Sequence, residues 1–122
     1  SSYDGVELSS NSFPGIISSP GALKILPGIT HIHNYAYSGD NLEHVEIPNT
    51  VVHIGIQAFA HNELTEVKLP ENLTSLYGYA FSHNELTHVT IPNKLEVIDI
   101  GAFKSNKLET IKLGDSLRRI GT

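Results

Sequence analysis

The sequence predicts an α/β solenoid, a right-handed stack of short coils with one parallel β-sheet along one face. The main reason is a repeat with a period of 22 residues. Complete copies begin at Leu42, Leu64 and Leu86, and a partial copy begins at Leu108. A degenerate copy precedes them, with matching side chains at Leu23, Ile25, Ile29, Ile32, Ala36 and Tyr37. Similarity at a fixed period is typical of repeat architectures, in which each coil packs only on its neighbours.

The first part of each repeat has the pattern of a short strand. In the second complete copy, Val67 and Leu69 are apolar, whereas Glu66 and Lys68 are polar. This alternation, with β-branched residues at equivalent positions of other copies, predicts a strand with one face in the core. Pro70 follows directly and ends the strand, because proline has no N–H to donate to a ladder. Stacked at about 4.8 Å, such strands are expected to form one parallel sheet.

The second part of each repeat is too short for a long helix. After the turn that follows Pro70, we expect Leu73 and Leu76 to point inward, together with Ala80 and Phe81. A short strand, a 3₁₀ turn or one helical turn ending near Asn84 is therefore predicted opposite the sheet. Because stacking aligns like residues, an aromatic column is predicted at Tyr37, Phe59, Phe81 and Phe103.

A polar column precedes the leading leucines by two residues, and its members are Asp40, Asn62, Asn84 and Asn106. A tight turn between coils leaves backbone groups without partners, and an asparagine amide can both donate and accept hydrogen bonds. We therefore expect a ladder of buried asparagines between the coils. Contact with a sugar or glycan is the alternative role of this column.

The string A-F-x-x-N-x-L-x-x-V-x-I-P, which fits Ala58 to Pro70 and Ala80 to Pro92, resembles the BspA-like leucine-rich repeats of bacterial and some protist surface proteins. The chain departs from the commonest leucine-rich repeat, because Thr50 and Lys94 stand where that repeat has asparagine. The resemblance covers about residues 23 to 122. It implies a secreted or cell-surface module for adhesion and recognition, often one segment of a longer chain.

The two ends of the chain differ from the middle. Residues 1–21 break the period and are predicted to form an N-terminal cap, with apolar side chains at Val6, Leu8, Phe13, Ile16 and Ile17. Residues 22–122 form the predicted solenoid of about four and a half coils. Its last coil has no neighbour for Leu108, Ile111, Leu113, Leu117 and Ile120. We therefore expect either a fragment of a longer chain or end-to-end self-association through this coil.

Composition argues against several functional classes. The net charge is −5 and the basic residues are dispersed, which disfavours a nucleic-acid partner. There is no cysteine, so disulfide scaffolds and thiolate chemistry are absent, and no apolar run is long enough for a membrane helix. No pairing of a nucleophile with a base and no glycine-rich phosphate loop can be placed. We therefore expect neither an enzyme nor a cofactor.

Histidines recur at matching positions of the repeats. His44 and His88 share a column with Glu66, His31 is in register with His53, and His61 is in register with His83. Imidazole and carboxylate ligands suit zinc, which makes the column with Glu66 the one candidate metal set. However, its two histidines would lie almost 10 Å apart, so no metal site is expected. The alternative is that the positions were copied by repeat duplication, beside a charge ladder of Lys24, Glu46 and Lys68.

The seven histidines predict sensitivity to pH. Histidine gains its proton near pH 6.5, and stacked imidazoles would then repel one another. Stability or binding should therefore weaken between about pH 7 and 5.

The predicted function is a non-catalytic module that binds a protein, either a host or matrix surface protein or another domain of the same chain. The contacts are expected on the open sheet, and we call the following residues the sheet face: His44, Glu46, Glu66, Lys68, His88, Thr90, Thr110 and Lys112. Ile56, Tyr79 and Ile100 either pack between coils or form a second contact patch. A structural spacer in a larger surface protein is the alternative function.

Overall fold

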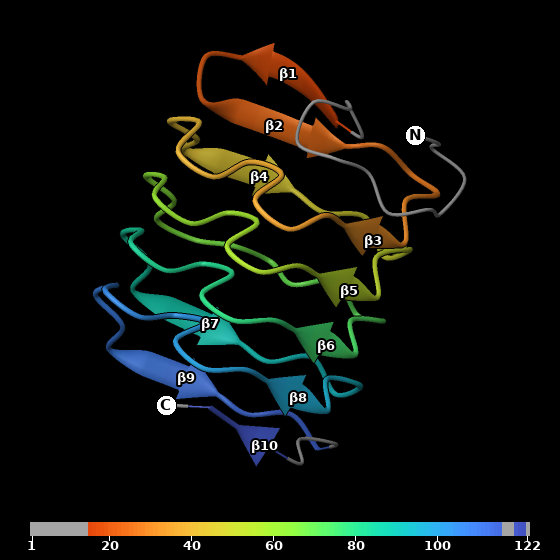
Figure 1. Cartoon of the computed structure of the whole chain (residues 1–122), viewed down its shortest axis with the longest axis vertical. Coiled ribbons are helices and arrows are strands. Elements are labelled where there is room, and N and C mark those ends of the chain that lie inside the picture. Colours follow the sequence, from red (N-terminus) through yellow and green to blue (C-terminus); the bar gives the residue numbers. More distant parts are fainter. Residues whose placement is uncertain (1–14, 116–118, 122) are drawn as a thin grey trace.

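The computed structural model describes residues 15–115 and 119–121. These residues form a stack of coils along the longest axis of the molecule, with two sets of short strands on two sides of the stack (Figure 1). The first set comprises β1 (Gly15–Ser19), β2 (Ala22–Ile25), β4 (His44–Glu46), β7 (His88–Thr90) and β9 (Thr110–Lys112). The second set comprises β3 (His31–Ile32), β5 (His53–Ile54), β6 (Ser75–Leu76), β8 (Val97–Ile98) and β10 (Arg119–Ile120).

The register of the strands confirms the 22-residue period. In the first set, Leu23 of β2 lies opposite Val45 of β4, and Val89 of β7 lies opposite Ile111 of β9, in parallel pairs. The second set is a continuous parallel sheet in the order β10-β8-β6-β5-β3. The predicted short strands opposite the main face are therefore present.

The prediction of one continuous sheet on the main face is wrong. Residues 65–69, between β4 and β7, form no strand, and their backbone groups make no hydrogen bond with other described residues. The face is divided into the sheets β1-β2-β4 and β7-β9. Three-residue strands share few ladder hydrogen bonds. The loss of one such pairing therefore costs little free energy of folding while the rest of the coil stays packed. Leu64, which precedes this segment, and Leu69, its last residue, remain buried.

The core consists of aligned columns of apolar side chains. Leu73, Leu76, Ala80 and Phe81 are all buried, as the sequence predicts. The aromatic column is also confirmed. Its successive ring centroids, from Tyr37 through Phe59 and Phe81 to Phe103, lie 5.7, 5.2 and 5.9 Å apart, with interplanar angles of 13°, 11° and 9°. Each coil therefore buries its aromatic ring against the ring of the coil before it.

The predicted helical turn is wrong, because the described residues contain no helix and their fold is all-β rather than α/β. Two columns have left-handed backbone conformations, with φ between 50° and 70°. They are Tyr35, Gln57, Tyr79 and Gly101, and Gly39, His61, His83 and Ser105. A left-handed residue cannot continue a right-handed helix. Its N–H turns sideways instead, and Gln57 donates to the carbonyl of Gly78 in the next coil at 3.0 Å.

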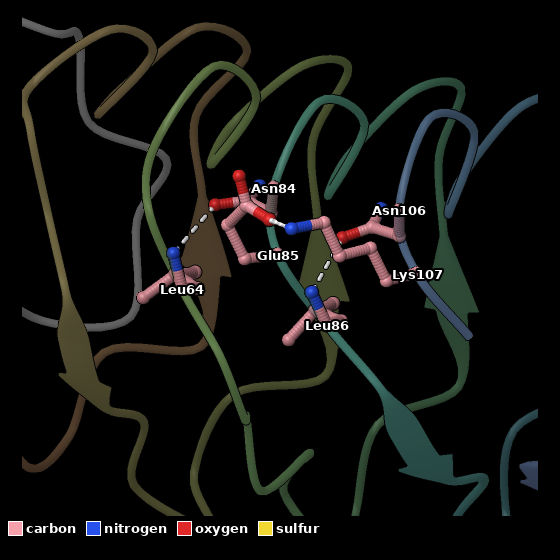
Figure 2. Close-up of polar contacts among 6 residues, drawn as sticks. All are labelled: Leu64, Asn84, Glu85, Leu86, Asn106 and Lys107. Carbon is pink, nitrogen blue, oxygen red and sulfur yellow. Dashed lines mark hydrogen bonds and ion pairs between the residues drawn. The ribbon is translucent and has the colours of Figure 1, made fainter. Parts of the chain in front are cut away.

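The asparagine column is confirmed as a ladder between coils. Asn62 and Asn84 are buried, and Asn106 is half-buried. The Oδ1 atom of Asn84 accepts a hydrogen bond from the N–H of Leu64 at 3.0 Å, and Asn106 does the same for Leu86 (Figure 2). The Nδ2 atom of each asparagine donates to phenylalanine carbonyls of its own coil and, for Asn84, to the Phe59 carbonyl one coil earlier at 2.9 Å. Each amide therefore connects two coils.

The first position of this column differs. Asp40 is exposed rather than buried, and its backbone N–H donates to Oδ1 of Asn62 at 3.1 Å. The buried ladder therefore begins one coil later than the sequence predicts.

At the N-terminal end, β1 pairs antiparallel with β2, and Ile17 lies opposite Leu23. Residues 1–14, including Val6, Leu8 and Phe13, lie outside the described residues. The division into a cap at 1–21 and a solenoid from residue 22 therefore stays a prediction.

At the other end, the last coil exposes apolar side chains. Ile111 and Leu113 are 45% and 53% exposed, whereas Val89 and Ile91, one coil earlier, are each 2% exposed. Leu108 is half-buried. Leu117 lies outside the described residues, and end-to-end association through this coil stays a prediction.

Replacement of Asn84 by alanine should lower the free energy of unfolding by about 2 kcal/mol, because the buried N–H of Leu64 loses its acceptor. Urea denaturation measures the change. Asn93→Ala is the matched control, since Asn93 is exposed and makes no side-chain hydrogen bond with described residues. Equal losses in the two variants would contradict the structural role of the ladder.

Replacement of Ser105 by glycine should raise stability by about 0.5–1 kcal/mol, because glycine relieves the left-handed strain but costs entropy in the unfolded chain. Ser75→Gly, in strand β6, provides the control and should destabilise by about the same amount. Urea midpoints of both variants test this pair, and a destabilised Ser105→Gly variant would refute the argument.

Candidate functional site

All eight sheet-face residues are exposed, as the alternation in the sequence predicts. Glu66 and Lys68 belong to the interrupted segment 65–69, with His44 and Glu46 of β4 on one side of it and the four sheet-face residues of β7 and β9 on the other. The face is therefore not flat, and its middle is the one part without cross-strand pairing.

A groove of about 610 Å³ opens at this interruption. It brings together five sheet-face residues, which are His44, Glu66, Lys68, His88 and Thr90. The other three, Glu46, Thr110 and Lys112, do not line it. Volumes of this order are typical of sites that hold a small molecule or a few side chains of a partner.

The groove also has apolar walls that the sequence did not reveal. Val45, Val67, Leu69 and Pro92 contribute to its lining. Val45 and Val67 belong to the inward-pointing column, but they are only partly buried, whereas Val89 in the paired strand β7 is 2% exposed. The missing ladder therefore opens a path from the surface to the edge of the core. No local pattern marks these residues, because their alternation is the same as in the paired coils.

Three charged side chains in the groove, Glu66, Lys68 and Glu71, have no salt-bridge partner among the described residues. Lys24 pairs with Glu46 at 3.7 Å, but the predicted continuation of this ladder to Lys68 is wrong. Among the described residues, neither Lys68 nor Glu66 makes a salt bridge or a side-chain hydrogen bond. Both groups are therefore free to interact with a ligand.

The structure gives no support to the candidate metal set. Within the residues that the structure describes, no group of three histidine, cysteine or acidic side chains is placed to hold one ion. This holds for His44, Glu66 and His88, which come from two separate sheets and the unpaired segment between them.

The type of repeat follows from a match to a known protein family. The family model described as BspA type leucine-rich repeat region (6 copies) matches residues 7–122. The chain belongs to this BspA-type family. Searches of curated proteins and of solved structures found no significant match. Leucine-rich repeat solenoids typically serve as scaffolds for protein interaction, and stacked coils provide them with an extended binding surface.

A second group of histidines lies away from the sheet face of this BspA-type solenoid. His31 and His53 are cross-strand partners in β3 and β5, with ring centroids 4.5 Å apart. His61 and His83 stack in the turns at 4.4 Å with an interplanar angle of 9°. The predicted registers of both histidine pairs are therefore confirmed.

The surroundings of His53 disfavour its protonated form. Burial lowers its pKa below the usual value near 6.5, and the neighbouring charge of His31 lowers it further. Its Nδ1 atom is buried and has no hydrogen-bond partner in the part of the chain that the structure describes. The ring also stacks on Tyr77, with centroids 6.0 Å apart, and a small cavity of about 180 Å³ lies beside it. The folded BspA-type chain therefore favours neutral His53.

The apolar turn residues differ in their burial, and a second contact patch stays a prediction. Tyr79 is half-buried and its ring lies over Gly101, where a Cβ atom would collide with it. Ile56 and Ile100 are 39% and 47% exposed. Tyr79 therefore packs between coils, while the two isoleucines of the BspA-type turns contact solvent.

No helix in the part of the chain that the structure describes has the length and apolar character needed to cross a membrane.

Stability should fall as the pH is lowered from about 7 to 5, because the unfolded chain binds a proton near pH 6.5 while folded His53 binds it only at lower pH. Full stability from this group is thus present above the unfolded pKa and is lost below it. His53→Gln should make the dependence of the urea midpoint on pH shallower. His44→Gln, at an exposed position without a ring contact, should leave it unchanged. Parallel profiles for wild type and His53→Gln would contradict this assignment.

Proposed function

We propose that this BspA-type chain is a non-catalytic recognition or adhesion module that binds a protein through its sheet face. The observation that carries the proposal is the exposed array of charged and polar side chains, hollowed at its centre by the groove of about 610 Å³. Regular coils hold these side chains in fixed relative positions, which lowers the ordering cost of association.

The family supports the same use. BspA-type repeats are typically extracellular or associated with the cell surface, so we place this module among secreted or surface proteins. Its partner would then be a host or matrix surface protein, or another domain of the same chain. The net charge of −5 favours such partners over nucleic acids.

Simultaneous replacement of His44, Glu66 and His88 by alanine should weaken binding by about tenfold or more, because these side chains form the rim of the groove. The purified chain and the variant are compared for saturable binding to immobilised extracellular-matrix and cell-surface proteins. The melting temperature should not change, since all three side chains are exposed.

The control removes the same residue types from the turns, in the variant with His61, Glu63 and His83 changed to alanine. These residues are also exposed, and His61 and His83 stack on each other away from the groove. Loss of binding in the groove variant alone supports recognition through the sheet face. Equal binding by both variants would move the site to another surface, and absence of saturable binding by the wild type would favour a structural spacer.

A further inference from the structure

We propose that the groove binds an extended peptide segment of the partner that carries one basic and one acidic side chain two residues apart. This inference rests on the proposed function and specifies the chemistry that the sheet face recognises.

Glu66 and Lys68, two of the unpaired charges in the groove, are arranged to match an extended ligand. Glu66 and Lys68 are two residues apart, and both are exposed while Val67 between them is partly buried, so their side chains lie on the same side of the segment. An extended ligand has the same period, and its side chains at positions i and i+2 face the same way. A basic group opposite Glu66 and an acidic group opposite Lys68 therefore match without distortion of either chain.

The interrupted ladder leaves these charges available to a ligand. In an unbroken parallel ladder, Glu46 and Lys68 would be cross-strand neighbours at about 5 Å. The interruption at residues 65–69 removes that pairing, and Glu46 pairs with Lys24 instead, at 3.7 Å. The charges of the groove are thus left uncompensated by the protein itself.

The apolar lining of the groove also favours a basic side chain on the ligand. Val45 and Val67 are partly buried and line the groove beside Glu66. A lysine or arginine of the ligand can lay its methylene stem on these valines while its charged head reaches the carboxylate. A ligand of like charges would leave Glu66 or Lys68 facing a repelling group.

The remaining titratable groups in the lining are His44, His88 and Glu71. The two histidines flank Glu66 in neighbouring coils, and the other titratable groups of the lining are carboxylates and one ammonium group. The lining therefore holds Glu66 and Glu71 against the single cation Lys68, which retains the requirement for a basic group on the ligand.

The test uses short fluorescent peptides in which two charged residues are separated by one threonine, with threonine and valine elsewhere. Three peptides carry the pairs Lys-Thr-Glu, Lys-Thr-Lys and Glu-Thr-Glu. A fourth places Lys and Glu next to each other, so that the side chains of an extended chain point to opposite sides. Binding to the full chain is measured by fluorescence anisotropy.

The wild type should prefer the Lys-Thr-Glu peptide over the other three by about tenfold. Glu66→Lys leaves two cations in the groove and should shift the preference to Glu-Thr-Glu. Lys68→Glu leaves three carboxylates and no lysine in the groove, and it should shift the preference to Lys-Thr-Lys. Because the rule concerns the sign of the charges, it holds for either direction of the peptide.

Glu63→Lys and Lys104→Glu are matched controls at exposed positions outside the groove, and they should leave the wild-type preference intact. The same preference in the wild type and in both groove variants would overturn the inference. So would equal binding of the adjacent-charge peptide. Self-association of the chain that is lost in Glu66→Lys would also overturn it, because a second copy would then be the occupant.

These outcomes are distinct from those for the proposed function. In one outcome, the alanine variant of the sheet face fails to capture partner proteins, but the peptide preference does not depend on the groove charges. The proposed function is then supported and the peptide inference is contradicted. If the charges control peptide preference while capture of proteins persists in the alanine variant, the peptide inference stands alone.

Discussion

The hydrogen bonds of the asparagine column are the interaction on which the rest of the structure depends. Each buried amide accepts a hydrogen bond from the N–H of the leading leucine of the coil before it, as Asn84 does from Leu64. The same amide donates to phenylalanine carbonyls, as Asn84 does to Phe59. A solenoid without long elements has no other way to satisfy backbone groups at its tightest turn, and burying them unpaired would cost more than the coil gains. The same bonds fix the register of the apolar columns, including the stacked rings of Phe59 and Phe81.

The left-handed columns follow from the same need. Where the chain turns back toward the sheet, Gln57 and His61 donate their N–H groups sideways, to Gly78 at 3.0 Å and Ser82 at 2.9 Å. These bonds to the neighbouring coil replace those that a helical turn would make within the segment. The strain of a positive φ at non-glycine residues is accepted because the coil is too short to satisfy its backbone internally.

The sequence predicted the parts of the fold that depend on the type of side chain. The asparagine and phenylalanine columns were visible because the same residues recur every 22 positions and their roles follow from their chemistry. The left-handed conformation was missed because it depends on the backbone, and its columns mix residue types, with Gly39 and Gly101 as the one hint. The exposed positions of the sheet face followed from alternation. The groove did not, because residues 65–69 have the same pattern as the paired strands.

The interruption that forms the groove is possible because the coil is held at other points. Leu64 is buried and hydrogen-bonded to Asn84 before the unpaired segment, Leu69 is buried at its end, and Leu73 is buried after it. Only the short stretch between them loses its ladder, which frees Lys68 from its cross-strand partner and opens Val67 to the surface. In such an architecture, the residues that maintain the stack are buried, whereas the charged and polar residues at the rim of the groove are exposed. Substitutions at the rim can therefore alter what one coil recognises without weakening the stack that presents it.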